Sequence, residues 1–333
     1  MNNPFFMIMN ILFPGCLRCL RTMILLVLLV VAGVPCRASQ SANGIKDSEL
    51  SALLKQGQRF FKEAKQDSAL SCFSRVENAY REDMSVENKE VCVRALLGKW
   101  VILYSSYFDY PGAFEALLKA KSISDDNALE IPRIDVYLAG MYQTIASESD
   151  DAGQFAAAMD YYRKAVETSA VTGDYATADL AFTNAVQLAA MGKVDADISK
   201  MYRSYRSIKP TTNDLRRDFN AALYACCMAM KRKESAKAVG IIDRAIRGIP
   251  DKPEYLRMKM IGYLMRAQAS LGLPDAGERR RCLDEALKFA DDHSVHDAMV
   301  DILMMMSTEA GASGDALHQR EYKLRALELK DSI

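Results

Sequence analysis

The sequence is poor in glycine and proline, with 17 and 9 among 333 residues, and runs of β-branched residues that alternate with polar ones are hard to find. This composition argues against β-sheets and turn-rich folds. Alanine, leucine, methionine, lysine, arginine and glutamate dominate instead, and all of them favour helices. Half of the residues are apolar, which is enough for a continuous core. The sequence therefore predicts an all-α protein.

An excess of positive charge is also missing. The chain has 43 basic and 43 acidic side chains, so its formal net charge is zero. Phosphate-binding surfaces need clustered lysine and arginine. Only two short basic runs occur, 231–233 and 279–281, and we expect both to be solvated helix ends. We therefore expect no nucleic-acid partner.

Motifs for catalysis and cofactor binding are absent from the sequence. Neither a dinucleotide-binding glycine motif nor a P-loop occurs, and none of the three histidines lies in a known nucleophile signature. His293 and His296 could hold a metal, but we expect Ser294 to cap a helix, with Asp297 as the acid of a capping box. We therefore expect no enzymatic activity, no cofactor and no metal site.

Cysteine usage does not indicate a disulfide framework. Three of the eight cysteines lie in the first 38 residues. The other five are scattered and odd in number, so we expect them to be buried thiols: Cys72, Cys92, Cys226, Cys227 and Cys282.

Residues 1–38 are predicted to be a signal peptide. Arg18 and Arg21 precede an apolar run, Met23–Val34, and small residues precede a cleavage site at Ser39. The apolar run has about 12 residues, whereas a membrane-spanning helix needs about 20. Cleavage is therefore favoured over a retained anchor, with lipid attachment at Cys36 as an alternative. Residues 39–47 are expected to be a linker, and the mature chain is expected in the bacterial periplasm or cell envelope.

A helical pattern that returns about every 40 residues fills the rest of the chain, residues 48–333. It is clearest in Gly153–Ala165, where a glycine turn and an aromatic residue precede small and large residues on one helical face. The pattern predicts about seven helical hairpins. The last small residue of each is expected at Val76, Ala120, Ala165, Ser204, Ala245, Ala286 and Ala326.

The first hairpin carries the spacing that is typical of one repeat family. The residues are Leu53, Gln56, Gly57, Phe60, Ala69 and Phe73. They follow the pattern W-x2-L-G-x2-Y…A-x3-F, and the chain thus resembles the tetratricopeptide-repeat (TPR) family. The resemblance implies a right-handed α-solenoid whose concave groove is lined by the first helix of each hairpin. Such a groove suits a peptide or a segment of another protein.

The resemblance also implies which positions face the groove. They are Phe61, Lys62, Ser105, Ser106 and Gln143. The leading hypothesis is thus an exported, non-catalytic scaffold for a protein or peptide, associated with the membrane only through an uncleaved or lipidated leader. An alternative comes from residues 322–333, which resemble the last TPR helix of membrane-bound bacterial sensor kinases and helix-turn-helix regulators. In that case the chain is a free-standing or truncated sensor module.

Overall fold

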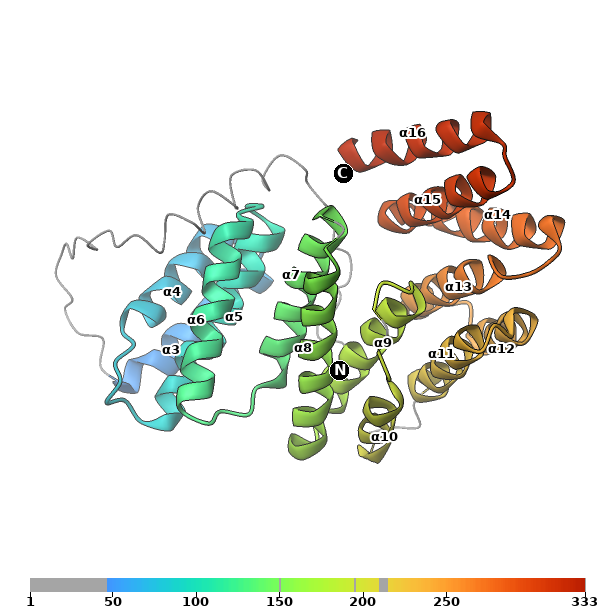
Figure 1. Ribbon diagram of the computed structural model, residues 1–333. Coiled ribbons are helices and arrows are strands. Elements are labelled where there is room, and N and C mark those ends of the chain that lie inside the picture. Colours follow the sequence, from blue (N-terminus) through green and yellow to red (C-terminus); the bar gives the residue numbers. More distant parts are fainter. Residues whose placement is uncertain (1–46, 150, 195, 210–214, 333) are drawn as a thin grey trace. The chain divides into compact units, whose positions relative to one another are not determined.

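The computed structural model describes residues 47–149, 151–194, 196–209 and 215–332 (Figure 1). The predicted signal peptide and residues 39–46 of the predicted linker lie outside this described part of the chain. Within it the structure has 14 α-helices, one short 3-10 helix and no strand. The prediction of an all-α protein is therefore confirmed.

The helices are joined by short connections. The first five are α3 (Asp47–Lys62), α4 (Gln66–Asn78), α5 (Val86–Ser105), α6 (Tyr110–Asp126) and α7 (Pro132–Ser149). The next five are α8 (Ala152–Thr172), α9 (Tyr175–Ala190), α10 (Ser199–Ser207), α11 (Leu215–Lys231) and α12 (Ser235–Gly248). The 3-10 helix η1 (Pro253–Tyr255) precedes α13 (Leu256–Ser270), α14 (Ala276–Asp292), α15 (His296–Ala312) and α16 (Ala316–Ser332).

Consecutive helices pack as antiparallel pairs, as Figure 1 shows for α3 with α4 and for α15 with α16. Helices two apart in sequence also touch: α3 contacts α5, and the series α9, α11, α13 and α15 is linked by contacts between neighbours. The helices divide into two compact units, residues 47–141 and 142–332, with the boundary inside α7. Each unit is described by itself below.

The first unit is built around the ring of Phe73 and the only tryptophan, Trp100. Gly57 and Gly98 approach Phe73 so closely that a Cβ atom added to either would lie 2.7 or 2.6 Å from the ring. The ring of Trp100 stacks on Tyr137 with a centroid distance of 4.1 Å. The lack of a side chain at Gly57, one of the residues of the repeat spacing, therefore allows a large neighbour to pack closely.

The second unit packs small residues where its helices meet. Ala158 and Ala165 of α8 and Ala286 of α14 are completely buried. Tyr322 and Ala326 of α16 join the core formed with α13, α14 and α15. The predicted repeat positions are thus packing sites in this unit, apart from Ser204 and Ala245, which stay partly exposed.

The five cysteines of the described chain are buried thiols, as the sequence predicts. Cys226 and Cys227 are neighbours in α11, and burial raises the pKa of Cys226 to about 12 and that of Cys227 to about 11.

Two expectations about helix ends were wrong. Ser294 does not cap α15: the helix begins at His296 after Val295, which makes no side-chain cap. Ser294 instead has a left-handed backbone with φ of 53°, and the N–H of Val295 donates to the carbonyl of Ala290 at 2.8 Å. This hydrogen bond closes the C-terminus of α14 in a Schellman motif, and that requirement sets the conformation of Ser294.

The second concerns one residue of the basic run 279–281, which we expected to be solvated; Arg280, Arg281 and the run 231–233 are exposed as expected. Arg279 is instead half-buried. Its Nε donates to Glu309 at 2.7 Å and its Nη1 to the carbonyl of Leu273 at 2.8 Å, because it joins α14 to α15 across the turn.

Candidate ligand-binding site

Four of the five positions expected to bind a partner lie in the first unit, at the C-terminal ends of α3 and α5. Phe61 is 9% exposed and belongs to the core, whereas the next residue, Lys62, is exposed. Ser105 donates to the carbonyl of Val101 at 2.6 Å, and Ser106 is the C-cap of α5. Because α3 and α5 contact each other, these positions sit at the ends of neighbouring helices.

The fifth position, Gln143, lies in the part of α7 that belongs to the second unit. Its side-chain oxygen accepts a hydrogen bond of 2.9 Å from the hydroxyl of Tyr162, which is itself buried in α8. Burial raises the pKa of Tyr162 well above its ordinary value.

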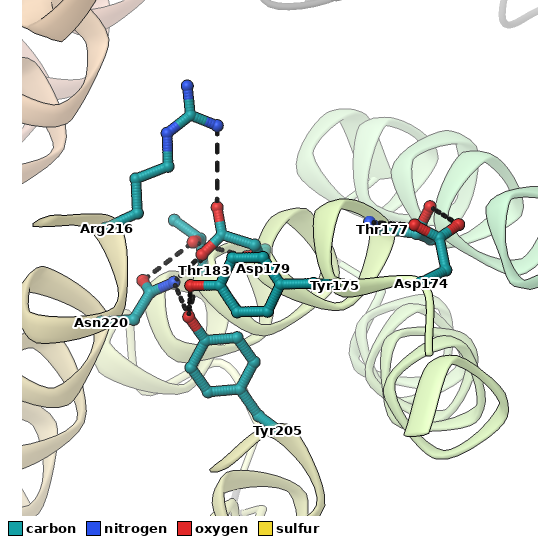
Figure 2. Close-up of polar contacts among 8 residues, drawn as sticks. All are labelled: Asp174, Tyr175, Thr177, Asp179, Thr183, Tyr205, Arg216 and Asn220. Atoms are coloured by element: carbon teal, nitrogen blue, oxygen red, sulfur yellow. Dashed lines mark hydrogen bonds and ion pairs between the residues drawn. The ribbon is translucent and has the colours of Figure 1, made fainter. Parts of the chain in front are cut away.

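A network of polar side chains joins α9, α10 and α11 of the second unit (Figure 2). We call it the polar cluster; its members are Tyr175, Asp179, Thr183, Tyr205, Arg216 and Asn220. Tyr205 and Asn220 are almost completely buried, and Asp179 is only 8% exposed. Because buried polar groups are costly unless they are hydrogen-bonded, the geometry of this cluster is closely constrained.

Asp179 is the centre of the polar cluster. Its Oδ1 accepts hydrogen bonds from the hydroxyl of Tyr205 at 2.9 Å and from Nδ2 of Asn220 at 2.7 Å. The hydroxyl of Tyr175 lies 3.0 Å from that of Tyr205. Since Tyr205 gives its proton to Asp179, Tyr175 is the donor in this pair. The carboxylate therefore orients two phenols and an amide from three helices.

Thr183 completes the network. Its hydroxyl lies 2.7 Å from the carbonyl of Asp179 and 2.9 Å from Oδ1 of Asn220. A hydroxyl has one proton, so the two acceptors share it. Burial and the charge of Asp179 raise the pKa of Tyr205 far above its ordinary value, which keeps the phenol neutral and able to donate.

Two guanidinium groups stand near the carboxylate. Nη1 of Arg216 lies 4.0 Å from Oδ2 of Asp179, and Figure 2 shows the side chain reaching toward it from α11. Arg257 of α13 is half-buried. Burial lowers its pKa to about 10, and the opposing effects of Asp179 and Tyr162 do not cancel that shift. The described residues provide Arg257 with no hydrogen-bond or ion-pair partner.

Aromatic rings surround the polar cluster. Tyr205 stacks on Phe182 with a centroid distance of 4.7 Å, and Tyr202 stacks on Tyr224 at 4.0 Å. The stacked rings hold α10 against α9 and α11. They thereby hold the phenol of Tyr205 within hydrogen-bonding distance of Asp179. This short helix of nine residues thus packs against α9 and α11 through its aromatic side chains.

The arrangement can recognise charge. The polar cluster contains no histidine or cysteine, and no group of three or more His, Cys, Asp or Glu side chains in the described residues is arranged to hold a metal. What it offers is a carboxylate with two guanidinium groups near it. Guanidinium groups pair well with carboxylates and other anionic groups.

The sequence analysis missed this cluster. A signal was available, because Asp179 and Thr183 are polar side chains four residues apart, and so on one face, in a largely apolar helix. Polar residues on the buried face of a helix need partners, and the partners of Asp179 lie 26 and 41 residues further along the chain.

No helix in the parts of the chain that the structure describes has both the length and the apolar character needed to cross a membrane. No family model matches the sequence, and a search of curated proteins finds no match.

Proposed function

We propose that the chain is a non-catalytic scaffold of TPR-like repeats that binds a segment of another protein. The succession of antiparallel helix pairs and the contacts among α9, α11 and α13 support this proposal, because stacked first helices form an extended surface in repeat proteins. A right-handed solenoid of about seven hairpins is part of the proposal. So is export through the predicted signal peptide to the periplasm or cell envelope.

The observation that carries the proposal is the guanidinium of Arg257, which is half-buried near Asp179 but makes no hydrogen bond or ion pair with the described residues. Partial removal of a charge from water costs free energy, and burial lowers the pKa of Arg257 although the charges of Asp179 and Tyr162 oppose that effect. A carboxylate from a ligand would pair with it in the bidentate geometry that arginine favours. Arg216, which is more exposed, lies close enough to interact electrostatically with Arg257.

The polar cluster then acts as the support of the binding surface. It holds α9, α10 and α11 together through buried hydrogen bonds. It also places Asp179 beside both arginines: its Oδ2 lies 4.0 Å from Nη1 of Arg216, and its charge acts on Arg257. The segment that fits this surface carries an acidic side chain or a terminal carboxylate.

Selection from a random peptide display library on the immobilised full chain tests the proposal. We expect enrichment of peptides with an acidic residue, and binding weakened about tenfold or more by Arg257→Gln, since charged hydrogen bonds contribute about 1.5–3 kcal/mol. Arg247→Gln, which changes an exposed arginine of α12, is the matched control and should bind as the wild type does.

Two results would contradict the proposal. One is an enriched set of peptides without acidic residues; the other is equal binding by the Arg257 variant and the wild type. Circular dichroism of both variants confirms that the fold is intact, so that weaker binding is assigned to the lost charge.

A further inference from the structure

The outer face of α16 carries an apolar stripe that no described helix covers. Leu317 is 75% exposed, Leu324 58% and Leu327 43%. Each of the other described helices exposes at most one large apolar side chain to a comparable degree. The inner face of α16 packs on α15 through Tyr322 and Ala326, so the stripe lies on the side that faces away from the core.

The stripe follows the spacing of a helix–helix seam. Leu317, Arg320, Leu324, Leu327 and Asp331 are separated by steps of three and four residues, which places them on one side of the helix. Arg320 and Asp331 are exposed, as the leucines are. The seam therefore has a basic residue toward its N-terminal end, an acidic residue at its C-terminal end and leucine between them.

This order of charges is self-complementary when the α16 helices of two copies run in opposite directions. If two α16 helices run antiparallel with Leu324 of one opposite Leu327 of the other, the same alignment puts Arg320 opposite Asp331 of the second copy. A two-fold axis repeats each contact, giving two leucine layers between two ion pairs. A parallel alignment in register would instead set Arg320 against Arg320 and Asp331 against Asp331.

We propose that α16 is a self-association surface, through which two copies of this chain pair their last helices antiparallel. The leucines supply the apolar area that is removed from water, and the ion pairs select the register and orientation more than they add affinity. The surface lies on the second unit and is independent of the ligand proposed above.

Charge reversal tests both the association and its geometry. In sedimentation velocity of the full chain, we expect the wild type to dimerise as concentration rises. Arg320→Asp and Asp331→Arg should each raise the dissociation constant about tenfold or more, because each replaces two attractive pairs by two repulsive ones. An equimolar mixture of the two variants should recover the dimer, since every reversed charge then meets its opposite.

Apolar contact is tested with one further pair of variants. Leu324→Lys should abolish the dimer, whereas Leu118→Lys, which changes a leucine of α6 that is 44% exposed, should leave it unchanged. Thermal unfolding of each variant shows that the fold persists. A monomeric wild type at every concentration, or single charge reversals that dimerise as well as the wild type, would overturn the proposal.

Discussion

The hydroxyl of Tyr205 shows how much one buried atom can contribute to stability. It donates to Asp179, accepts from Tyr175 and lies 3.3 Å from Nδ2 of Asn220. We expect Tyr205→Phe to lower the free energy of unfolding by about 1–3 kcal/mol, because a buried carboxylate oxygen and a buried phenol each lose a partner. Urea denaturation followed by circular dichroism measures the change.

Tyr202 provides the matched control on the same helix. It is half-buried, stacks on Tyr224 and packs at a tilt against Phe182, but its hydroxyl makes no hydrogen bond with the described residues. Tyr202→Phe should therefore change the free energy of unfolding by only a few tenths of a kcal/mol. Equal effects of the two substitutions would show that ring stacking, and not the hydrogen-bond network, stabilises this region.

The carboxyl groups of Asp297 and Asp301 on α15 predict a dependence on pH. Partial loss of water around the carboxyl groups raises the pKa of both to about 6, at Asp297, which is half-buried, and at Asp301, which remains in contact with solvent. His296 opposes the shift at Asp297, while at Asp301 the charge of Asp297 adds to it and Lys330 opposes it. The folded state then holds more protons than the unfolded state between about pH 4 and 6. The free energy of unfolding therefore falls as pH rises through that range and levels off above it.

Replacing Asp301 should remove part of this dependence. Asp301→Asn is expected to raise the melting temperature at pH 8, where the wild-type carboxyl is charged, and to leave it nearly unchanged at pH 4. Asp301 is exposed to solvent, so screening keeps the gain to about 1 kcal/mol or less. Asp291→Asn, at an exposed carboxyl of α14, should show no such difference between the two pH values.

Packing residues that follow the spacing of the repeats could be predicted from the sequence. Contacts between polar residues far apart in the sequence could not. Gly57 and Ala158 stand at repeat spacing, and both are packing sites. Asp179 and Asn220 meet across 41 residues. Their contact depends on how α9 and α11 stack, which the spacing of apolar residues does not specify.

At the scale of single helices, Ala158 of α8 offers a direct test of close packing. It is completely buried, whereas Ala156, two residues earlier, is exposed. Ala158→Leu should lower the free energy of unfolding by about 1–3 kcal/mol, because added methyl groups overpack the helix interface. Ala156→Leu should have almost no effect. A stable Ala158 variant in chemical denaturation would mean that the interface is looser than the structure shows.

Helix ends supply the opposite kind of prediction, a stabilising one. Ala64, Ala128, Lys233 and Ser294 all adopt positive φ at the C-terminal ends of helices, a conformation that costs non-glycine residues about 1–2 kcal/mol. Lys233→Gly should therefore raise the free energy of unfolding by about 0.5–1 kcal/mol, net of the greater flexibility of glycine in the unfolded chain.

The reverse substitution serves as its control. Gly314 has a φ of 81° in the turn between α15 and α16, and Gly314→Ala should destabilise the protein by about 1 kcal/mol or more. Thermal denaturation of both variants shows whether the first is stabilised and the second destabilised. A destabilised Lys233 variant would show that its side chain contributes more than its backbone costs.

These ends also explain why helix boundaries were harder to predict than the helices themselves. The apolar repeat identified the hairpins, because period and burial agree within each helix. The turns that close with Ala64, Lys233 or Ser294 carry no glycine to mark them. The capping prediction at Ser294 failed for this reason, since the residue ends α14 and does not begin α15.

For the whole molecule, the single tryptophan makes one unit separately observable. Trp100 is buried in the first unit, whereas circular dichroism follows the helices of both. In repeat proteins each element is stabilised by its nearest neighbours. Tyr205→Phe in the second unit should therefore shift the unfolding transition seen by circular dichroism while that seen by tryptophan fluorescence stays in place. Transitions that shift together would show that the described chain unfolds as one cooperative block.

The buried thiols give this array a second kind of readout. Cys72 and Cys92 belong to the first unit, and Cys226, Cys227 and Cys282 to the second. A thiol enclosed in this way is alkylated only when its surroundings open, so the rate at which each cysteine acquires a label measures how often that hairpin opens. The native cysteines therefore report local opening at several points along the chain. Mass spectrometry can measure their labelling rates without any engineered probe.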